Sequence, residues 1–361
     1  MSTISEVARA AGVSVATVSR ALRGVSTVNP HTRDRVLAAA DQLHYVASPT
    51  AASLASGRTR VVGIVTPFMT RWFFVTAMSA IEKVLREHDF HALLIDLEAD
   101  DMMSRRPLTN QMLSKRVDGL ITITVPLRPD ELALLQRLDL PVVAIGNPLP
   151  GHPLVRIDDA AAVHTAVDHL VELGHTRIGY VGAVPPDAEH RLVPGGRLHG
   201  FRDAMSGHGL TVQERWVITC DWTAQDAARR TAPVFDTDHT PTAILAASDE
   251  MAIGVMSVAI TAGLRIPQDL SVVGVDDYHL SDVVRLTTIS QDVTAQGHAA
   301  AAILLHTLLG DTESPAPDLP AGLTDEQTLT LPTSLVRRAT TGRLRSAAAT
   351  PPSLLGSPTD R

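Results

Sequence analysis

The sequence contains very little cysteine and few aromatic residues. Cys220 is the only cysteine among 361 residues, so no disulfide can form within the chain. No apolar stretch reaches the length of about 18 residues that a membrane-spanning helix needs, and no signal-peptide pattern opens the chain. We therefore expect a soluble cytoplasmic protein without a membrane partner. Because aromatic residues make up only 3% of the chain, any cluster of them is informative.

The motifs of common enzyme classes are absent as well. The chain has no G-x-S-x-G, no P-loop and no G-x-G-x-x-G, and the glycines of residues 195–200 do not have the last spacing. The fifteen histidines are scattered without the spacing of metal ligands. We therefore expect no enzymatic activity, no cofactor and no metal site.

Charge is distributed unevenly along the chain. The net charge is −8, yet residues 1–60 hold seven arginines against three acidic residues, a balance of +4. The remaining 301 residues therefore carry −12. A small basic head on a large acidic body indicates a DNA-binding protein with a separate second function, and the length suits two or three domains.

Residues 3–20 predict two short helices joined by a tight turn. Thr3 and Glu6 have the spacing of a capping box, and Gly12 supplies the positive φ that the turn needs. Ser14 can cap the second helix. This pattern is typical of a helix-turn-helix, which places its second helix in the major groove of DNA.

A third helix at about 31–44, capped by Asn29, completes a three-helix domain over residues 1–46. Its expected apolar stripe consists of Val36, Leu37, Ala40 and Leu43. Residues 47–60 are too few and too poor in apolar side chains to pack alone, so we expect a hinge there.

From residue 61 onward, short apolar runs alternate with amphipathic segments. Strands are expected at 61–67, 91–97, 119–125, 142–146, 177–182, 243–247, 271–275 and 288–290. Helices are expected at 74–88, 108–116, 129–138, 160–173, 197–207, 223–230, 249–263 and 295–309. Such alternation predicts an α/β fold with parallel sheets, and its length predicts two lobes over residues 61–340 with a cleft at the carboxyl ends of the strands. The end, 341–361, is rich in Ser, Thr, Pro and Ala, and we expect it to be disordered.

Beyond the head, several motifs occur in a characteristic order, at 53–60, 117–121, 169–175, 177–181, 197–201, 248–254, 263–277 and 286–292. With these motifs the chain resembles the LacI/GalR family of bacterial transcription regulators from residue 3 to about residue 338. The resemblance implies a type I periplasmic-binding-protein-like core behind the head. It also implies a homodimer on a pseudo-palindromic operator of double-stranded DNA.

The resemblance implies two groups of DNA contacts, to base edges from Val15, Ala16 and Arg20 and to phosphates from Ser14, Thr17 and Ser19. The chemistry of Arg20 fits, because a guanidinium can donate two hydrogen bonds to a guanine edge. Leu54 in the hinge matches the family leucine that wedges into the minor groove at the centre of the operator.

The resemblance also implies an effector cleft, with ligand contacts from Arg197, Trp222 and Asp276 and a further position at Ser248. The aromatic run of residues 72–74 adds Phe73 and Phe74 near the cleft mouth, and Gln291 is a further candidate. A guanidinium that donates and a carboxylate that accepts can bind the vicinal hydroxyls of a sugar, while aromatic faces pack on its C–H side. Ser248 stands where the family often has asparagine, and Val275 where it often has an aromatic residue. These departures predict a roomier cleft and leave the identity of the effector open.

We therefore expect a repressor of carbohydrate uptake or catabolism genes that a small sugar releases from its operator. The same architecture can respond to a purine or another metabolite, which can also act as a co-repressor, and a partner protein can serve as co-repressor. Prolines 351, 352 and 358 interrupt the tail, so we do not expect the leucine-heptad helix through which some relatives form tetramers.

Overall fold

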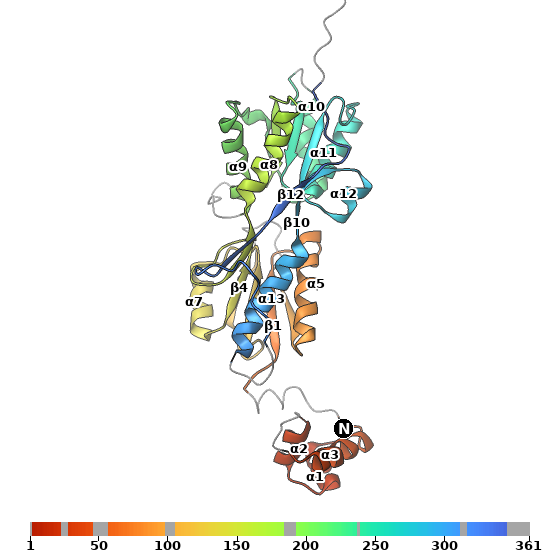
Figure 1. The fold of residues 1–361 in the computed structure, drawn as a ribbon, viewed down its shortest axis with the longest axis vertical. Coiled ribbons are helices and arrows are strands. Elements are labelled where there is room, and N and C mark those ends of the chain that lie inside the picture. The colour runs from red at the N-terminus through yellow and green to blue at the C-terminus, as the bar shows by residue number, and fades with distance from the viewer. Residues whose placement is uncertain are drawn as a thin grey trace, which may run out of the picture.

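The structure is a computed structural model that describes residues 2–22, 28–45, 57–97, 105–183, 193–236, 239–310 and 316–344. Figure 1 shows a small helical head followed by two α/β lobes, stacked along the long axis. We name the lobe next to the head the lower lobe and the other the upper lobe. Each lobe contains one six-stranded sheet. The predicted fold class, two α/β lobes behind a helix-turn-helix head, is confirmed.

The head consists of three helices, α1 (Ile4–Ala11), α2 (Val15–Leu22) and α3 (Pro30–Gln42). The predicted capping box is present, since the Thr3 N–H donates to Glu6 Oε2 at 2.7 Å and the Glu6 N–H donates to Thr3 Oγ1 at 3.3 Å. Gly12 ends α1 with φ +64°, the left-handed conformation that the turn requires. Asn29 caps α3 by accepting from the His31 N–H at 2.9 Å.

The core of the head is small and consists of a few apolar side chains from each of the three helices. Val7, Val18 and Val36 are fully buried and bring the three helices together. The predicted stripe of α3 was wrong at Leu37, which is 48% exposed. Consecutive helical residues point about 100° apart, so the inward position of Val36 turns Leu37 toward solvent.

The lower lobe is built on β1 (Val61–Thr66), β2 (His91–Asp96), β3 (Gly119–Ile123), β4 (Val142–Ile145), β5 (Leu154–Ile157) and β11 (Thr328–Leu331). All neighbours are parallel, in the order β11-β5-β4-β3-β1-β2. Its helices are α5 (Trp72–Glu87), α6 (Asn110–Leu113), α7 (Pro129–Leu138) and α13 (Val293–Leu309). Alternation along β3 separates two cores, because Ile121 packs toward α5 and α13 whereas Leu120 packs toward α6 and α7.

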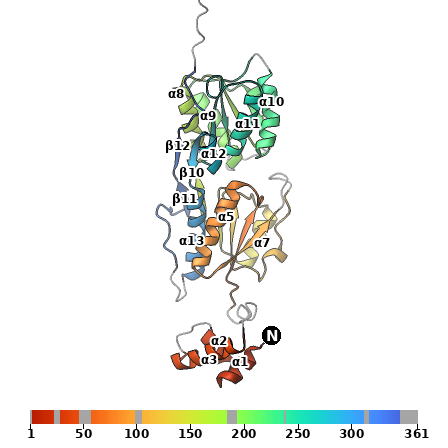
Figure 2. The ribbon, with the colours of Figure 1, turned by 90° about the vertical axis from the view of Figure 1, so that its right-hand side faces the viewer.

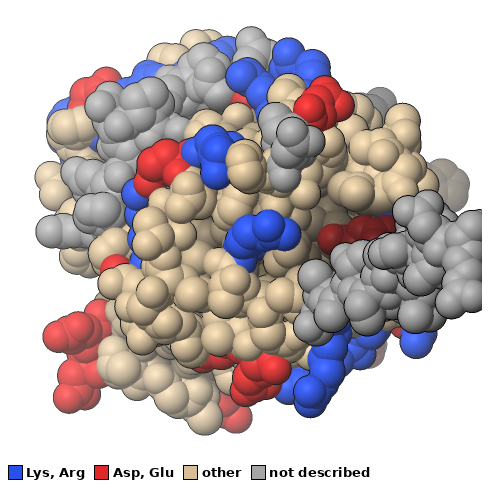
Figure 3. Space-filling view, turned by 90° about the horizontal axis from the view of Figure 1, so that it is seen from above, with Lys and Arg blue, Asp and Glu red and all other residues tan. Residues whose placement is uncertain are grey.

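The upper lobe is built on β6 (Ile178–Gly182), β7 (Val217–Thr219), β8 (Ala243–Ala246), β9 (Ser271–Asp276), β10 (Thr287–Gln291) and β12 (Thr333–Val336). The order is β12-β10-β9-β8-β6-β7, and only β12 runs antiparallel to its neighbour. Its helices are α8 (Asp159–Glu172), α9 (Val193–Gly207), α10 (Ala224–Phe235), α11 (Asp249–Thr261) and α12 (His279–Val283). Seen from this end of the molecule, charged side chains of both signs are scattered among uncharged ones (Figure 3).

The chain crosses between the lobes three times, from β5 to α8, from β10 to α13 and from β11 to β12. As a result, α13 and β11 belong to the lower lobe although they come late in the sequence. Figures 1 and 2 show α13 beside α5 from two directions. Gly297 makes this approach possible, because a Cβ there would lie 2.7 Å from the carbonyl oxygen of Ala77.

The strand and helix predictions identify most elements but miss the short ones. The missed strands and α-helices are β5, β7, β11, β12 and α12, and α6 is shorter than its predicted range. Residues 341–344, predicted to begin a disordered tail, instead follow the upper lobe: the Gly342 N–H donates to Ser271 Oγ at 3.1 Å and the Leu344 N–H to the Leu173 carbonyl at 2.9 Å. Residues 345–361 lie outside the described residues. Among the described helices none has both the length and the apolarity to cross a membrane.

Candidate functional site

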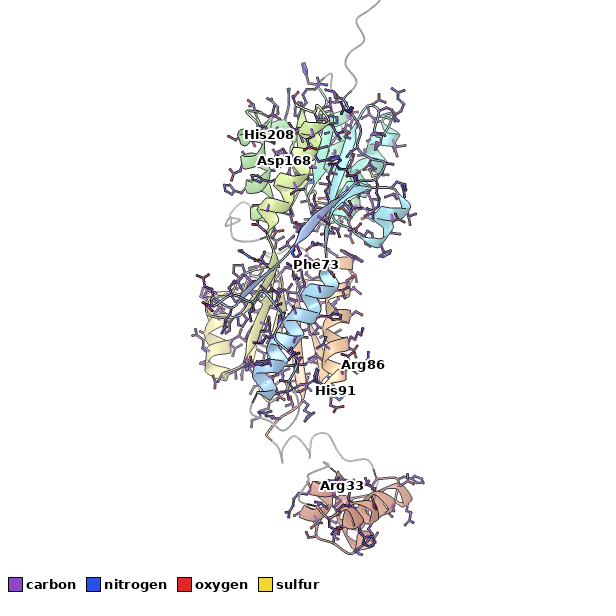
Figure 4. All side chains as sticks on the ribbon, viewed as in Figure 1. Arg33, Phe73, Arg86, His91, Asp168 and His208 are labelled. Carbon is purple, nitrogen blue, oxygen red and sulfur yellow. The ribbon has the colours of Figure 1, made fainter. Side chains whose placement is uncertain are left out.

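A cavity lies between the two lobes, with walls from both. The empty space between its walls, the open mouth included, is about 800 Å³. The structure brings all seven predicted effector-binding residues to it, namely Phe73, Phe74, Arg197, Trp222, Ser248, Asp276 and Gln291. Figure 4 labels Phe73, which lies at the junction of the lobes. Their contact with an effector remains a prediction.

Arg197 lies on α9 and is fixed from two sides. Its Nε donates to Asp159 Oδ1 at 2.7 Å, and its Nη1 donates to the carbonyl oxygen of Ala247. Nη1 also lies 3.8 Å from Asp276 Oδ1. Burial alone would lower the pKa of Arg197, but the carboxylates of Asp159 and Asp276 raise it above its usual value. The guanidinium is therefore a charged donor held rigidly in the upper-lobe wall.

Asp276 ends β9 and begins a chain of buried hydrogen bonds. Its Oδ1 accepts from Gln291 Nε2 at 2.6 Å, and Gln291 Oε1 accepts from Gln296 Nε2 at 2.9 Å. Because Gln296 lies on α13, this chain connects the upper lobe to the lower lobe. Burial raises the pKa of Asp276 to about 8, although the charge of Arg197 opposes the shift. The carboxyl group can therefore take up a proton near neutral pH.

Aromatic rings form the other part of the cavity wall. Phe73 packs edge-on against Phe74 with ring centroids 5.5 Å apart, and Phe74 is only 8% exposed and belongs to the lower-lobe core. Trp72 contacts Tyr278 of the upper lobe at 5.4 Å, so this pair bridges the lobes. Trp222 lies 5.8 Å from the guanidinium of Arg197. Among the three aromatic residues predicted to bind the effector, Phe73 and Trp222 are half-buried, whereas Phe74 is buried.

Ser248 and Asp249 join the cavity to the frame of the upper lobe. Ser248 caps α11, since its Oγ accepts from the Met251 N–H at 3.3 Å. Asp249 is fully buried and accepts from Ser281 Oγ and Thr288 Oγ1, both at 2.6 Å. The first residue thus contributes a hydroxyl at the cavity wall, and the second holds α12 and β10 in place behind it.

The cavity also contains polar residues that the sequence analysis missed. These residues are Arg71, Thr124, Asn147, Asp159, Glu250 and Gln296. Thr124, Asn147 and Asp159 each follow the end of a parallel strand of the lower lobe, where ligands bind in such sheets. That rule could have identified Thr124 and Asn147 from the predicted strands, whereas β5, which precedes Asp159, was itself missed.

The head presents a mixed apolar and basic surface on α2. Val15 is 43% exposed, and Ala16 and Arg20 are exposed as well. Arg20 Nε donates to the carbonyl oxygen of Ala16 at 3.2 Å, which holds its guanidinium along this face. Ser14 Oγ accepts from the Thr17 N–H at 3.2 Å and lies 2.9 Å from Thr17 Oγ1.

The remaining two DNA-binding predictions differ in how far the structure describes them. Ser19 is half-buried on α2, whereas Leu54 lies outside the described residues. The contacts of all seven residues with DNA stay predictions.

The end of the hinge is anchored to the lower lobe by Asp118. This carboxylate accepts from the Thr59 N–H at 2.7 Å, from Thr59 Oγ1 at 2.8 Å and from the Arg60 N–H at 2.7 Å. Arg58 Nη1 adds a bond to the carbonyl oxygen of Leu308 at 2.9 Å. Asp118 lies within residues 117–121, a motif to which the sequence analysis assigned no role.

Comparison with known proteins agrees with both parts of the molecule. Residues 3–48 match the profile of bacterial regulatory proteins of the lacI family, and residues 167–341 match a periplasmic binding protein-like domain. Catabolite control protein A of Priestia megaterium is 32% identical over 84% of this chain and 91% of its own length. The transcriptional repressor PurR of Photobacterium profundum is 33% identical over the same shares.

The fold comparison covers head, hinge and lobes together. The lac repressor dimer bound to operator and the anti-inducer ONPF has a TM-score of 0.78 and 27% identity, over 94% of this chain and 99% of that one. The sequence matches and this likeness span the helix-turn-helix and the two-lobed core in one chain. The protein therefore belongs to the LacI family of DNA-binding transcriptional regulators.

Proposed function

We propose that this regulator is a homodimeric repressor of carbohydrate uptake or catabolism genes and that a small sugar releases it from its operator. The observation that carries the proposal is that a hydrogen-bond donor, Arg197, and an acceptor, Asp276, line the same cavity as several aromatic rings. Arg197 can donate to one sugar hydroxyl while Asp276 accepts from its neighbour. The faces of Trp222 and Phe73 suit the C–H side of the sugar ring.

On the DNA side, the exposed face of α2 supports a division of labour. Arg20 would read a guanine edge, and Val15 and Ala16 would make apolar contacts such as to a thymine methyl group. The hydroxyls at the start and flank of the helix, those of Ser14, Thr17 and Ser19, would bind phosphates. Leu54 would wedge into the minor groove between two half-sites.

The proposed mechanism is a linkage between the cavity and the hinge. A ligand held between Arg197 above and Phe73 below draws the lobes together about the three crossovers. The hinge is bonded to the lower lobe through Asp118, so a shift of this lobe moves the hinge with it. The pairing of the hinge segments in the dimer is then lost and operator affinity falls. Coupling of this kind amounts to about 1–3 kcal/mol.

A second effector class is favoured by one observation. Half-buried rings come from both lobes, Phe73 from below and Trp222 from above, and two such faces also suit a planar heterocycle such as a purine. Such a ligand would strengthen operator binding if it stabilised the DNA-bound arrangement of the lobes.

The test begins with operator selection from a randomised duplex pool, using the full-length protein at fixed salt. Fluorescence anisotropy of the selected duplex is then measured against a panel of sugars and purines. Release by one sugar supports the proposal, and strengthening by a purine supports the second class. We expect Arg197→Gln to lose the effector response, and Arg202→Gln, an exposed position on the same helix, to keep it. Failure to enrich any duplex, or an equal response in both variants, would refute the proposal.

A further inference from the structure

Two polar atoms in the lower-lobe wall of the cavity have no hydrogen-bond partner in the described part of the protein. One is Nη1 of Arg71, the residue directly before α5, and the other is Oγ1 of Thr124, directly after β3. Both atoms are buried, and Thr124 as a whole is only 9% exposed. Both residues line the effector cavity. Because buried polar atoms in proteins are nearly always bonded, this pair indicates a place for a polar ligand group.

The start of α5 adds backbone donors that have no partner among the described residues. Arg71 gives the helix no side-chain cap, and the first N–H of the helix with a partner within the described chain is that of Val75, bonded to the Arg71 carbonyl at 3.1 Å. The N–H groups of Trp72, Phe73 and Phe74 precede it and belong to residues that line the cavity. A helix of 16 residues carries a partial positive charge at this end, and oxyanions bind there.

The guanidinium of Arg71 is held in position without being neutralised. It lies 3.5 Å from the ring centroid of Phe68. Burial lowers the pKa of Arg71, and the nearby carboxylates of Glu250 and Asp221 partly oppose this shift. Neither carboxylate forms an ion pair with Arg71 among the described residues. The cavity wall thus contains a half-buried cation that no carboxylate of the described chain pairs with, and an anionic ligand group would suit it.

We propose that Arg71, Thr124 and the start of α5 form an oxyanion subsite, and that the effector is a sugar bearing a carboxylate or phosphate group. The inference rests on the proposed function and narrows it. Arg71 and the N–H groups of α5 would donate to the oxyanion, together with the hydroxyl of Thr124. Arg197 and Asp276, on the opposite wall, would bind the sugar hydroxyls.

The first experiment uses small anions and the full-length protein. Inorganic phosphate and acetate are titrated at ionic strength held constant with chloride, and the fluorescence of Trp72 and Trp222 in the cavity reports binding. We expect a saturable response, weakened about tenfold or more by Arg71→Gln, because a hydrogen bond from a charged group is lost. Arg86→Gln is the matched control, since Arg86 lies near the far end of the same helix (Figure 4) and is exposed.

A second variant protects the test against misfolding. Thr124→Val keeps the shape of the side chain and removes only the hydroxyl, so we expect weaker anion binding with an unchanged circular dichroism spectrum. The two anions distinguish the sources of the group: preference for phosphate indicates a sugar phosphate, and preference for acetate indicates a sugar acid. No response beyond that of chloride, or equal responses in the wild type and Arg71→Gln, would overturn the subsite.

Operator release separates this inference from the function on which it rests. Glucose, glucuronate and glucose 6-phosphate are compared on the selected operator with each variant. An anion response that depends on Arg71, without release of the operator by any sugar on the panel, would support the subsite and count against the sugar-released repressor. Release by neutral glucose that is unchanged in Arg71→Gln would support the repressor and refute the oxyanion subsite.

Discussion

Replacing Asp118 with alanine tests whether the hinge acts on DNA through its anchor on the lower lobe. In the structure one carboxylate accepts three hydrogen bonds from Thr59 and Arg60, all between 2.7 and 2.8 Å. Alanine removes all three acceptor contacts at once and leaves the Thr59 and Arg60 N–H groups to water. The neighbouring β3 begins at Gly119 and keeps its own strand pairing, so the sheet itself stays intact.

The size of the effect follows from these bonds. A hydrogen bond to a charged group contributes about 1.5–3 kcal/mol in favourable settings. Asp118 is half-exposed and its three bonds share one carboxylate, so we discount the sum to about 2 kcal/mol. If the anchored hinge is needed for the heads to meet both half-sites, this loss weakens operator binding by about tenfold to thirtyfold. Asp118→Asn keeps one carbonyl acceptor, so its operator affinity should lie between that of the wild type and that of Asp118→Ala.

The assay is anisotropy of the selected operator, with thermal unfolding measured in parallel. We expect the operator affinity of Asp118→Ala to fall while the main unfolding transition of the lobes moves little. Glu87→Ala, an exposed acidic position at the end of α5, controls for the loss of one negative charge near the DNA-facing end. Operator binding within twofold of the wild type by a folded Asp118→Ala would refute the reasoning, because the anchor would then have no bearing on DNA.

Three other predictions follow from the head, the cavity and the upper-lobe packing. Arg20→Ala should cost about 1–3 kcal/mol at one base pair and Ser19→Ala should weaken every operator variant alike, so parallel losses across all variants for both would contradict the assigned roles. Burial raises the pKa of Asp276 from 3.8 to about 8, so between these pH values the folded state retains a proton that the unfolded chain has released. The free energy of unfolding should therefore fall as the pH rises from about 4 to about 8, and an Asp276→Asn variant with the same slope would count against this. A Cβ at Gly254 would collide with the carbonyl oxygen of Ala224, so Gly254→Ala should destabilise the upper lobe by about 1–3 kcal/mol in urea unfolding, and an unchanged midpoint would show that α10 can yield.

The fold was predictable where the sequence carries long, periodic apolar signals. Strands such as β1 and β9 are nearly continuous apolar runs buried on both faces, so their pattern stands out. The strands β11 and β12 are four-residue segments in which half of the residues are threonine or serine, and only Leu329 among them is buried. Their place in two different sheets depends on partners more than 40 positions away, at Leu154 and Thr288. No local pattern contains that information.

The residues of the candidate site likewise include some that the sequence predicts and some that it does not. The seven predicted cavity residues came from the family resemblance and from the aromatic run at residues 72–74, and the structure brings all of them to one cavity. Arg71 gave no such signal, because it is distinguished by a nitrogen atom that has no hydrogen-bond partner among the described residues. Such an absence is a property of the packed molecule and leaves no pattern in the sequence. Asp118 likewise lies 58 positions from Arg60, the hinge residue that it holds. Sequence motifs thus predict the residues that face a ligand more readily than those that connect the ligand to the hinge.

The placement of these groups limits which ligands can act on DNA binding. A ligand shifts an equilibrium between two arrangements only by the difference in its affinity for them. A molecule that binds only the wall with Arg197 and Asp276 touches the upper lobe alone and gains nothing when the lobes move. A molecule that also reaches Arg71 and the start of α5 gains contacts only as the lobes approach. On the proposed mechanism, the lower-lobe contacts therefore decide whether a bound sugar acts as an effector or merely occupies the cavity, and Arg71→Gln should reduce operator release more than it reduces binding.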